Sequence, residues 1–190
     1  MTAKSGFSLF GALILGVCAA SAQEAVNRKA SIGDFGVFEP VGGKMEVVAL
    51  PESTSGAKRT PTGIHFLERT RMIPAKKGVQ FGFNYEITGA QKGPLEVMII
   101  VTHPRIQKPD GSISSGFKFK EKLPVVDGIA KGFTGYSFDH EYELVPGEWK
   151  FEFWVREGKL LEWTFVSCPE NQDARPSYES TALPLYEKTN

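Results

Sequence analysis

The chain has 190 residues, with 22 Lys or Arg residues against 22 Asp or Glu residues, so its formal net charge at pH 7 is zero. A balanced charge argues against nucleic acid and anionic membrane surfaces as partners, because both select for a basic excess. Beyond the N-terminal segment, no stretch is apolar enough to span a bilayer. We therefore expect no nucleic-acid partner and no stable membrane insertion after processing of the N-terminus.

Residues 1–22 are typical of a cleavable secretory signal peptide. Lys4 supplies a short positive region, and residues 7–17 form an apolar stretch that is too short for a stable transmembrane helix. Ala20-Ser21-Ala22 then offers the small side chains that signal peptidase accepts. We predict cleavage after Ala22, a mature chain that begins at Gln23, and an exported protein that is periplasmic or secreted.

The two cysteines bear on this prediction in different ways. Cys18 would carry the lipid of a lipoprotein, but Val17 precedes it where a small residue is the rule. A soluble product is therefore the main prediction, and a lipid-modified or uncleaved anchor is the alternative. Cys168 is the single cysteine after cleavage, which excludes an intramolecular disulfide. It is interpreted as a half-buried thiol at a strand end, with an intermolecular disulfide as the alternative.

Period-two alternation of apolar and polar residues recurs along the mature chain, and no segment shows convincing helical periodicity. The clearest strand is 79–87, in which every second residue is apolar. In chain order, strands are predicted at residues 35–39, 45–50, 64–73, 79–87, 95–101, 117–120, 133–142, 149–155 and 160–166.

Turn residues separate these strands. Pro109-Asp110-Gly111 suits a type I turn, and Val145-Pro146-Gly147 is typical of a turn as well. Residues 51–62 are rich in Ser, Thr, Gly, Pro and Lys and are expected to form a long surface loop. Many short strands joined by such turns predict an all-β sandwich or barrel.

The chain therefore divides into four segments. We expect a signal peptide at 1–22, an N-terminal extension at 23–31, a β-sandwich domain at 32–168 and a polar C-terminal tail at 169–190.

One hairpin can be predicted in register. With a two-residue loop after residue 156, the aromatic residues of 149–155 and 160–166 would point to opposite faces of the sheet. A three-residue loop, Arg156-Glu157-Gly158, pairs Trp149 with Phe165, Phe151 with Trp163 and Phe153 with Leu161. The apolar match favours the three-residue loop, with Gly158 in a left-handed bulge.

Four blocks of the sequence resemble a known family. They are residues 33–38 (GDFGVF), 73–82 (IPAKKGVQFG), 102–104 (THP) with 109–111 (PDG), and 143–149 (ELVPGEW). Together they resemble a family of exported bacterial proteins classed as domain of unknown function 3859. The resemblance implies an antiparallel immunoglobulin-like β-sandwich and a location in the bacterial envelope. It implies no catalytic residue, because the family has no assigned activity.

The three histidines give no metal-site pattern, because His65, His103 and His140 have no His or Cys partner at ligand spacing. Asp139-His140-Glu141 is the most ligand-like cluster. On a strand, however, His140 would point away from its two acidic neighbours. We therefore predict no metal site and no cofactor.

The sequence also contains no recognised catalytic motif. No Gly-x-Ser-x-Gly elbow occurs, and Ser112, Ser114 and Ser115 lie in a polar turn region. No Gly-rich phosphate loop precedes a helix. The acidic residues near 141–152 are interpreted as a solvated strand face rather than a hydrolytic carboxylate pair; they are Glu141, Glu143, Glu148 and Glu152. We predict no catalytic residue.

Two surface features could serve binding. In the predicted hairpin, Trp154 falls on the outer face, opposite Leu160 and beside Lys150 and Arg156. Such a tryptophan could stack on a sugar or anchor a protein, or it could be covered by another segment. Lys118, Lys120 and Lys122 form a basic stripe, which is interpreted as protection of an edge strand, with attraction to an anionic polymer as the alternative.

These observations favour a binding domain over an enzyme. We expect a non-enzymatic β-sandwich that binds a protein or polymer of the cell envelope through Trp154, Leu160, Lys150 and Arg156. The alternative is an envelope hydrolase acting on glycans or peptides, with a site assembled from loops. A convergent acid pair or a Ser–His pair in a pocket would favour the enzyme.

Overall fold

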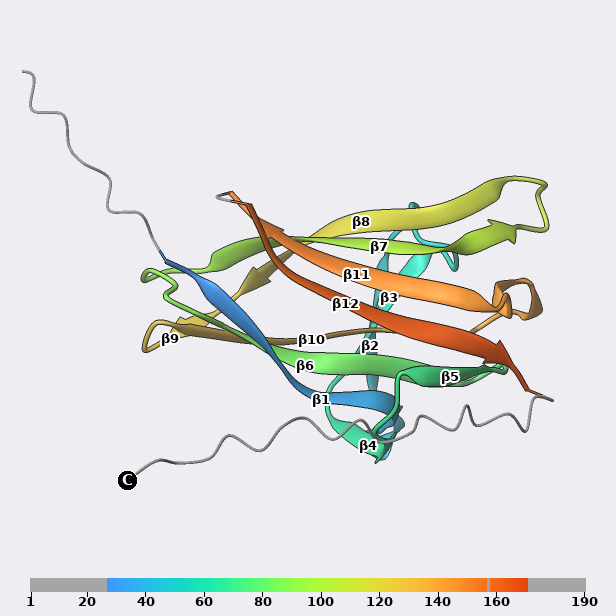
Figure 1. Ribbon diagram of the computed structural model, residues 1–190, viewed down its shortest axis with the longest axis horizontal. Helices are drawn as coiled ribbons and strands as arrows, with labels where there is room; N and C mark the ends of the chain where they lie inside the picture. Colours follow the sequence, from blue (N-terminus) through green and yellow to red (C-terminus); the bar gives the residue numbers. More distant parts are fainter. Residues whose placement is uncertain (1–26, 157, 171–190) are drawn as a thin grey trace, which may run out of the picture.

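Two five-stranded sheets face each other across an aromatic core (Figure 1). The computed structural model describes residues 27–156 and 158–170. The first sheet contains β1 (Lys29–Pro40), β4 (Ile64–Glu68), β6 (Gln80–Thr88), β9 (Val125–Val126) and β10 (Ile129–Ser137). The second contains β5 (Met72–Ala75), β7 (Leu95–Gln107), β8 (Ile113–Leu123), β11 (Gly147–Val155) and β12 (Gly158–Pro169). The predicted signal peptide lies outside the described residues.

The order of strands is β4-β1-β6-β10-β9 in the first sheet, called here the β6 sheet, and β5-β12-β11-β7-β8 in the second, the β11 sheet. Neighbouring strands are antiparallel except β5 and β12, which are parallel. The predicted all-β sandwich is confirmed, and its sheets are antiparallel apart from this one pair. No helix among the described residues is both long enough and apolar enough to cross a membrane.

A separate hairpin, β2 (Met45–Ala49) and β3 (Ala57–Pro61), crosses the strands of the sandwich at a steep angle (Figure 1). A short 3₁₀ helix, Val41–Gly43, leads into it from β1. The predicted surface loop at 51–62 is wrong in this region, because five of its residues form β3 and the loop residues Ser53 and Thr54 are only 2% exposed. Polar composition did not reveal that the hairpin tip is buried by contacts from distant strands.

Two further strand predictions are corrected. The single strand expected at 64–73 is split into β4 and β5, which belong to different sheets. The chain bends at Arg71, where the Thr70 hydroxyl accepts the N–H of Met72 at 3.0 Å, a local bond that interrupts strand pairing. The strand expected at 133–142 ends at Ser137, and a 3₁₀ helix follows at Glu141–Glu143.

The domain bounds are wider than the sequence suggested. β1 begins at Lys29 and pairs with β6 from that residue, so the expected extension at 23–31 already contributes to the sheet. β12 runs to Pro169, which pairs with Ala75, and Glu170 accepts a hydrogen bond from Lys76 at 2.7 Å. The remainder of the expected tail lies outside the described residues.

Large aromatic side chains from both sheets fill the core. Phe81 and Phe83 of β6 and Trp149, Phe151 and Phe153 of β11 are all fully buried. The Phe83 and Phe151 rings are 5.6 Å apart and nearly perpendicular, as are Phe81 and Trp149 at 5.8 Å. Edge-to-face pairs of this kind add to the free energy gained by burying apolar area.

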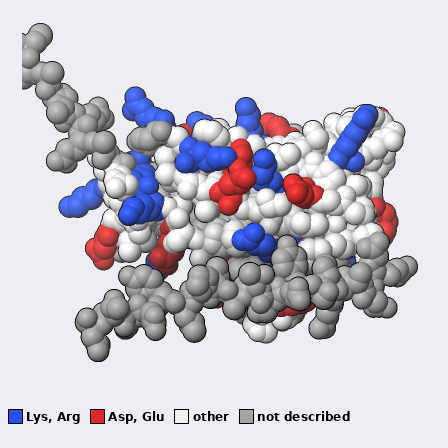
Figure 2. Space-filling view, viewed as in Figure 1, with Lys and Arg blue, Asp and Glu red and all other residues white. Residues whose placement is uncertain are grey.

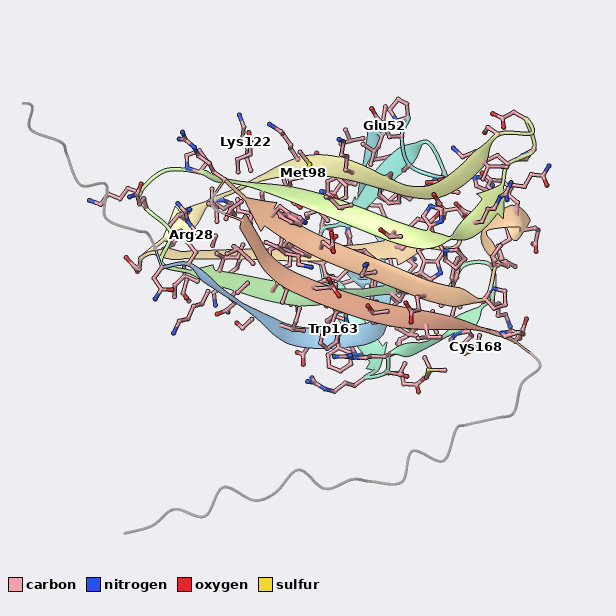
Figure 3. All side chains as sticks on the ribbon, turned by 45° about the horizontal axis from the view of Figure 1, so that its top comes forward. Arg28, Glu52, Met98, Lys122, Trp163 and Cys168 are labelled. Carbon is pink, nitrogen blue, oxygen red and sulfur yellow. The ribbon has the colours of Figure 1, made fainter. Side chains whose placement is uncertain are left out.

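The predicted β11–β12 register is confirmed over its aromatic part. Trp149 pairs with Phe165, Phe151 with Trp163 and Phe153 with Leu161. Trp163 is only partly buried, because it lies at the open side of the sandwich (Figure 3), with the Arg71 guanidinium 3.5 Å from its ring centroid.

The predicted three-residue loop is wrong, because Val155 pairs with Gly158 and the register shifts between Phe153 and Trp154. Gly158 has the expected positive φ, at 143°. The extra residue is Leu160, which forms a bulge inside β12 between the pairs Phe153–Leu161 and Trp154–Lys159, rather than lengthening the loop.

Replacing Phe151 by Ala should lower the free energy of unfolding by about 3–5 kcal/mol, because the substitution leaves a cavity between the two sheets. Lys122→Ala, at an exposed position on the same sheet, is the control and should change it by less than about 0.5 kcal/mol. Urea denaturation of both variants measures the difference. Equal midpoints would mean that the β11–β12 register is not the one described.

Candidate functional site

Trp154 lies on the outer face of the β11 sheet and is 37% exposed. The residues on either side of it, Phe153 and Val155, point inward and are buried, so the alternation of the strand directs Trp154 outward. Across the sheet it pairs with Met98 of β7 and Lys159 of β12. The sequence therefore placed Trp154 on the correct side of the strand.

Neighbouring charged groups hold the indole of Trp154 in place. Its Nε1 donates to Glu152 Oε2 at 3.2 Å, and Lys159 Nζ lies 5.9 Å from the ring centroid. Lys159 also bonds Glu152 at 3.3 Å and Glu162 at 2.7 Å. The hydrogen bond from Trp154, together with Lys159, lowers the pKa of the Glu152 carboxyl, so this side chain stays ionised in mildly acidic solution.

The other predicted surface residues have different outcomes. Leu160 does not face Trp154, because the bulge in β12 brings Lys159 opposite the indole, and Leu160 packs against the core instead. Lys150 lies on the same face, with its Nζ 3.9 Å from Glu152 Oε1. Arg156 is exposed at the end of β11. The outward-facing group Met98, Lys150, Glu152, Trp154 and Lys159 is called the Trp154 face below.

The basic stripe borders the Trp154 face. Lys118, Lys120 and Lys122 alternate along β8, which is the edge strand of the β11 sheet. Lys120 pairs with Met98 across the sheet and forms an ion pair with Glu96 at 2.7 Å. Figure 3 shows Met98 and Lys122 beside the strands β7 and β8. An edge position agrees with the interpretation that the lysines discourage pairing with other chains.

Positive and negative side chains are interspersed on the face of the molecule shown in Figure 2. Around Trp154 this mixture has a local cause, since Glu152 and Glu162 each bond Lys159. A tryptophan surrounded by paired charges has the composition of an interface anchor with a polar rim.

A second cluster, centred on His103, was not predicted. His103 lies on β7 and is only 4% exposed. Its Nε2 is 3.1 Å from both Thr54 Oγ1 and Ser114 Oγ, and its Nδ1 is 2.7 Å from the Pro104 carbonyl oxygen. The ring stacks on Trp149, with the centroids 4.9 Å apart. The inward alternation of Val97, Ile99 and Val101, continued by two residues, was the signal in the sequence that could have placed His103 in the core.

The geometry fixes the protonation of His103. A carbonyl oxygen only accepts, so Nδ1 carries the proton, and Nε2 accepts from the hydroxyls of Thr54 and Ser114. Burial lowers the pKa of His103, and the charge of Lys108 lowers it further, against the opposing effect of the bond to Pro104. The imidazole is therefore neutral in the folded protein near pH 7.

The same cluster fastens the tip of the β2–β3 hairpin to the sandwich. Besides the bond between Thr54 and His103, Lys108 Nζ donates to the Ser53 carbonyl at 3.2 Å. The Tyr142 hydroxyl donates to the Thr54 carbonyl at 3.4 Å. Glu52, at this tip, stands on the β7–β8 side of the molecule in Figure 3.

Glu143 corrects the interpretation of the acidic residues as one solvated face. Its carboxylate is fully buried and accepts bonds from the Tyr136 hydroxyl at 2.6 Å and from the N–H groups of Asp139 and His140 at 2.7 and 2.8 Å. Burial and the nearby carboxylate raise the pKa of Tyr136. These bonds explain why β10 stops at Ser137 and the chain turns into a 3₁₀ helix.

The described part of the chain brings no three His, Cys, Asp or Glu side chains together in a way that could hold a metal ion. Asp139 and His140 both direct their N–H groups to Glu143, and the His140 ring stacks on Tyr142 at 5.0 Å. The Asp139-His140-Glu141 segment thus serves as a turn around a buried carboxylate.

Two facing sheets, closed on one side by a crossing hairpin, define this protein as an immunoglobulin-like β-sandwich. A crystal structure of an immunoglobulin-like protein from Pseudomonas aeruginosa is similar to it, with 25% sequence identity and a TM-score of 0.51. The match covers 74% of this chain and 97% of that one. The family model Domain of unknown function (DUF3859) matches residues 28–166, and the chain belongs to this family.

Two larger solved structures match more weakly. The DNA glycosylase AlkC from Pseudomonas fluorescens is 12% identical, with a TM-score of 0.34, over 51% of this chain and 27% of that one. A β-glucosidase from Listeria innocua is 13% identical, with a TM-score of 0.30, over 52% of this chain and 15% of that one. No curated protein matches the chain.

The stability of the fold should fall as the pH drops below about 6.5, the ordinary pKa of histidine. In the unfolded chain, His103 takes up a proton around that pH. In the folded protein, its imidazole stays neutral until the pH falls to its lowered pKa. The slope should be at most about 1.4 kcal/mol per pH unit from this group. Urea midpoints between neutral and acidic pH measure it.

His103→Gln should remove this component of the pH dependence, because an amide accepts a hydrogen bond without titrating. His65→Gln, at an exposed histidine that bonds Glu39, is the matched control and should retain it. Parallel pH profiles for the wild type and His103→Gln would contradict the assignment to His103.

Proposed function

We propose that this protein is exported and acts as a non-enzymatic binding domain, which attaches a protein or polymer of the cell envelope to the Trp154 face. The observation that carries the proposal is an exposed tryptophan on a sheet face whose other side already supplies the core. The fold does not need Trp154 for its interior, so a role at the surface accounts for a large aromatic side chain there.

The surroundings of Trp154 support this role. The bond to Glu152 and the nearby Lys159 restrict the rotation of the indole, so less conformational entropy is lost when a partner binds. Met98 extends the apolar contact area onto β7. Lys150, Lys159 and Glu152 provide the polar rim that surrounds the anchor residues of many interfaces.

The alternative is a hydrolase. One pair of residues, Ser114 and His103, supports it. Ser114 Oγ lies 3.1 Å from His103 Nε2, the spacing of a nucleophile and its base, and the Pro104 carbonyl orients the ring. However, His103 is buried under the hairpin tip, and Thr54 shares the same nitrogen. A substrate would have to displace both. The arrangement therefore favours a structural role for the pair and supports a binding domain over an enzyme.

Export can be tested directly. The protein recovered from the periplasm or medium should begin at Gln23, because the Ala20-Ser21-Ala22 segment fits the signal-peptidase subsites. N-terminal sequencing or intact mass measurement identifies the first residue. A lipid-modified Cys18, or protein that retains residues 1–22, would contradict soluble export.

Replacing Trp154 by Ala should reduce the recovery of crosslinked envelope partners several-fold while lowering the free energy of unfolding by less than about 1 kcal/mol. Leu67→Ala is the control, since Leu67 is 56% exposed on β4 of the other sheet. Crosslinking in native envelopes followed by pull-down measures recovery, and digestion of the captured material separates protein from polymer. Loss of stability with unchanged recovery would mean that Trp154 is a packing residue under a covering segment.

A further inference from the structure

One edge of the β11 sheet is unpaired over most of its length. β12 pairs with β11 on one side, whereas on its other side β5 covers only the last four residues of the strand. None of the described strands pairs with the rest of this edge, residues 158–165. On this side, the N–H of Val166 donates to the Arg71 carbonyl at 2.8 Å. Because backbone groups alternate along a strand, the N–H groups of Thr164 and Glu162 point to the same open side.

The other strand edges of the sandwich have features that discourage pairing. β8 carries the alternating lysines, β5 has four residues and includes Pro74, and the unpaired part of β1 contains a bulge at residues 33–34. β4 and β9 are short, with five and two residues. From Leu161 to Phe165, by contrast, the open edge of β12 has no proline, lysine or bulge. A strand edge of this kind needs a cover, because it otherwise pairs with other chains.

The side chain of Arg71 lies beside this edge. Its guanidinium is 3.5 Å from the ring centroid of Trp163, at the open side of the sandwich (Figure 3). Arg69 lies on the Phe35 ring in a similar way but is bonded to Asp34 at 3.0 Å. No carboxylate among the described residues pairs with Arg71. Stacking on an indole occupies a face of the guanidinium and leaves the N–H groups at its rim for a carboxylate.

The chain itself continues next to the open edge. Glu170, directly after β12, accepts a bond from Lys76 at 2.7 Å, just beyond the end of β5. Residues 171–190 follow, and twenty residues span up to about 70 Å when extended. The strand from Trp163 to Glu170 measures about 23 Å. Residues 171–190 are therefore long enough to turn back beside β5 and reach the open edge.

One stretch of residues 171–190 is suited to pair with a strand. Residues 177–183 (SYESTAL) lie between Pro176 and Pro184 and form the longest run without proline in this part of the sequence. Proline has no N–H to donate to a neighbouring strand, so a continuous ladder requires such a run. Seven residues are enough to cover the open edge of β12 from residue 161 to residue 165.

Chain length determines which of these residues reach Arg71. Glu170 lies seven residues past Trp163, on whose ring Arg71 is stacked. We consider a chain that turns back within about two to four residues and runs antiparallel to β12, first outside β5 and then along the open edge. Seven residues after the turn, at about residues 179–181, this chain is level with Trp163.

Glu179 is the carboxylate at that level. By the same count, Asp173 falls in or next to the turn, and Glu187 lies past the start of β12. A carboxylate and a guanidinium form short, charge-assisted hydrogen bonds. Chain length and charge therefore select Glu179 as the partner that Arg71 lacks among the described residues.

We propose that residues 177–183 pair with the open edge of β12 as an additional antiparallel strand of the β11 sheet, and that the Glu179 carboxylate bonds the Arg71 guanidinium. The N–H groups of Glu162 and Thr164 then donate to carbonyl groups of the added strand. The chain thereby covers its own open edge. This pairing does not involve the Trp154 indole, so the pairing and the proposed function can fail separately.

Hydrogen exchange of two amides tests the pairing. In the exported, ¹⁵N-labelled protein, the amides of Glu162 and Thr164 should exchange at least about tenfold more slowly than in the Ser180→Pro/Thr181→Pro variant. Two adjacent prolines interrupt the added strand, because they remove its N–H donors and restrict its backbone. The substitutions lie after β12, so they leave the sandwich itself unchanged.

Two controls accompany this measurement. Lys188→Pro/Thr189→Pro, beyond the pairing segment, is the matched variant, and its amides should exchange like those of the wild type. The Phe165 amide faces β11 and should stay slow in every variant, which shows that the sandwich remains folded.

Charge variants test the contact between Glu179 and Arg71. Glu179→Gln should speed exchange of the Glu162 and Thr164 amides about two- to fivefold, as expected for the loss of a partly exposed ion pair. Glu187→Gln is the control and should leave the rates unchanged. Arg71→Glu should also speed exchange. Arg71→Glu/Glu179→Arg should slow it again at least about twofold, because the pair re-forms with exchanged charges.

Other results overturn the proposal. Equal rates in the wild type and the Ser180→Pro/Thr181→Pro variant would mean that residues 177–183 do not cover the edge. Slow exchange that persists in that variant and becomes slower as the protein concentration rises would mean that a second copy covers it. Equal effects of Glu179→Gln and Glu187→Gln would refute the ion pair. Trp154→Ala should leave the rates unchanged, so failure of the proposed function would not affect this result.

Discussion

The indole of Trp149 is the packing constraint on which the rest of the structure depends. It is fully buried, and it contacts Phe81 and Tyr136 of the facing sheet at centroid distances of 5.8 and 4.3 Å. Its Nε1 donates to Ser167 Oγ at 3.2 Å, which ties β11 to β12, and His103 stacks on its ring. One side chain therefore joins both sheets and supports the histidine that holds the hairpin.

Two side chains that contact Trp149, His103 and Tyr136, explain why one side of the sandwich is covered by additional chain and the other is not. Through His103, the tip of the β2–β3 hairpin is fixed over one side of the sandwich, where it covers an aromatic cavity. Through Tyr136, the buried carboxylate of Glu143 turns the chain after β10. The outer face of the β11 sheet has no such covering strand among the described residues, and it carries Trp154 at its surface.

The neutral state of His103 links stability to pH. The hairpin tip depends on an imidazole that accepts bonds from two hydroxyls, and protonation removes that acceptor and places a charge in the core. Lys108, which also bonds the hairpin tip, increases the cost of this charge. The attachment of the β2–β3 hairpin is thus sensitive to acid.

Elements whose signal is local could be predicted from the amino-acid sequence. Alternation identified β6 and β11, and the match of aromatic residues set the pairing of Phe151 with Trp163, because a slip by one residue would reverse a whole face. It also placed Trp154 outward. Three features emerge only in the folded protein: residues 53–54 are buried, Glu143 is a core carboxylate, and Leu160 packs inward at a bulge. The burial of residues 53–54 depends on groups far apart in the chain, since Thr54 and His103 are 49 residues apart, and such a pairing leaves no period in the sequence. The bonds of Glu143 span only three to seven residues, but they form in a turn, where no alternation of apolar and polar residues marks a buried side chain.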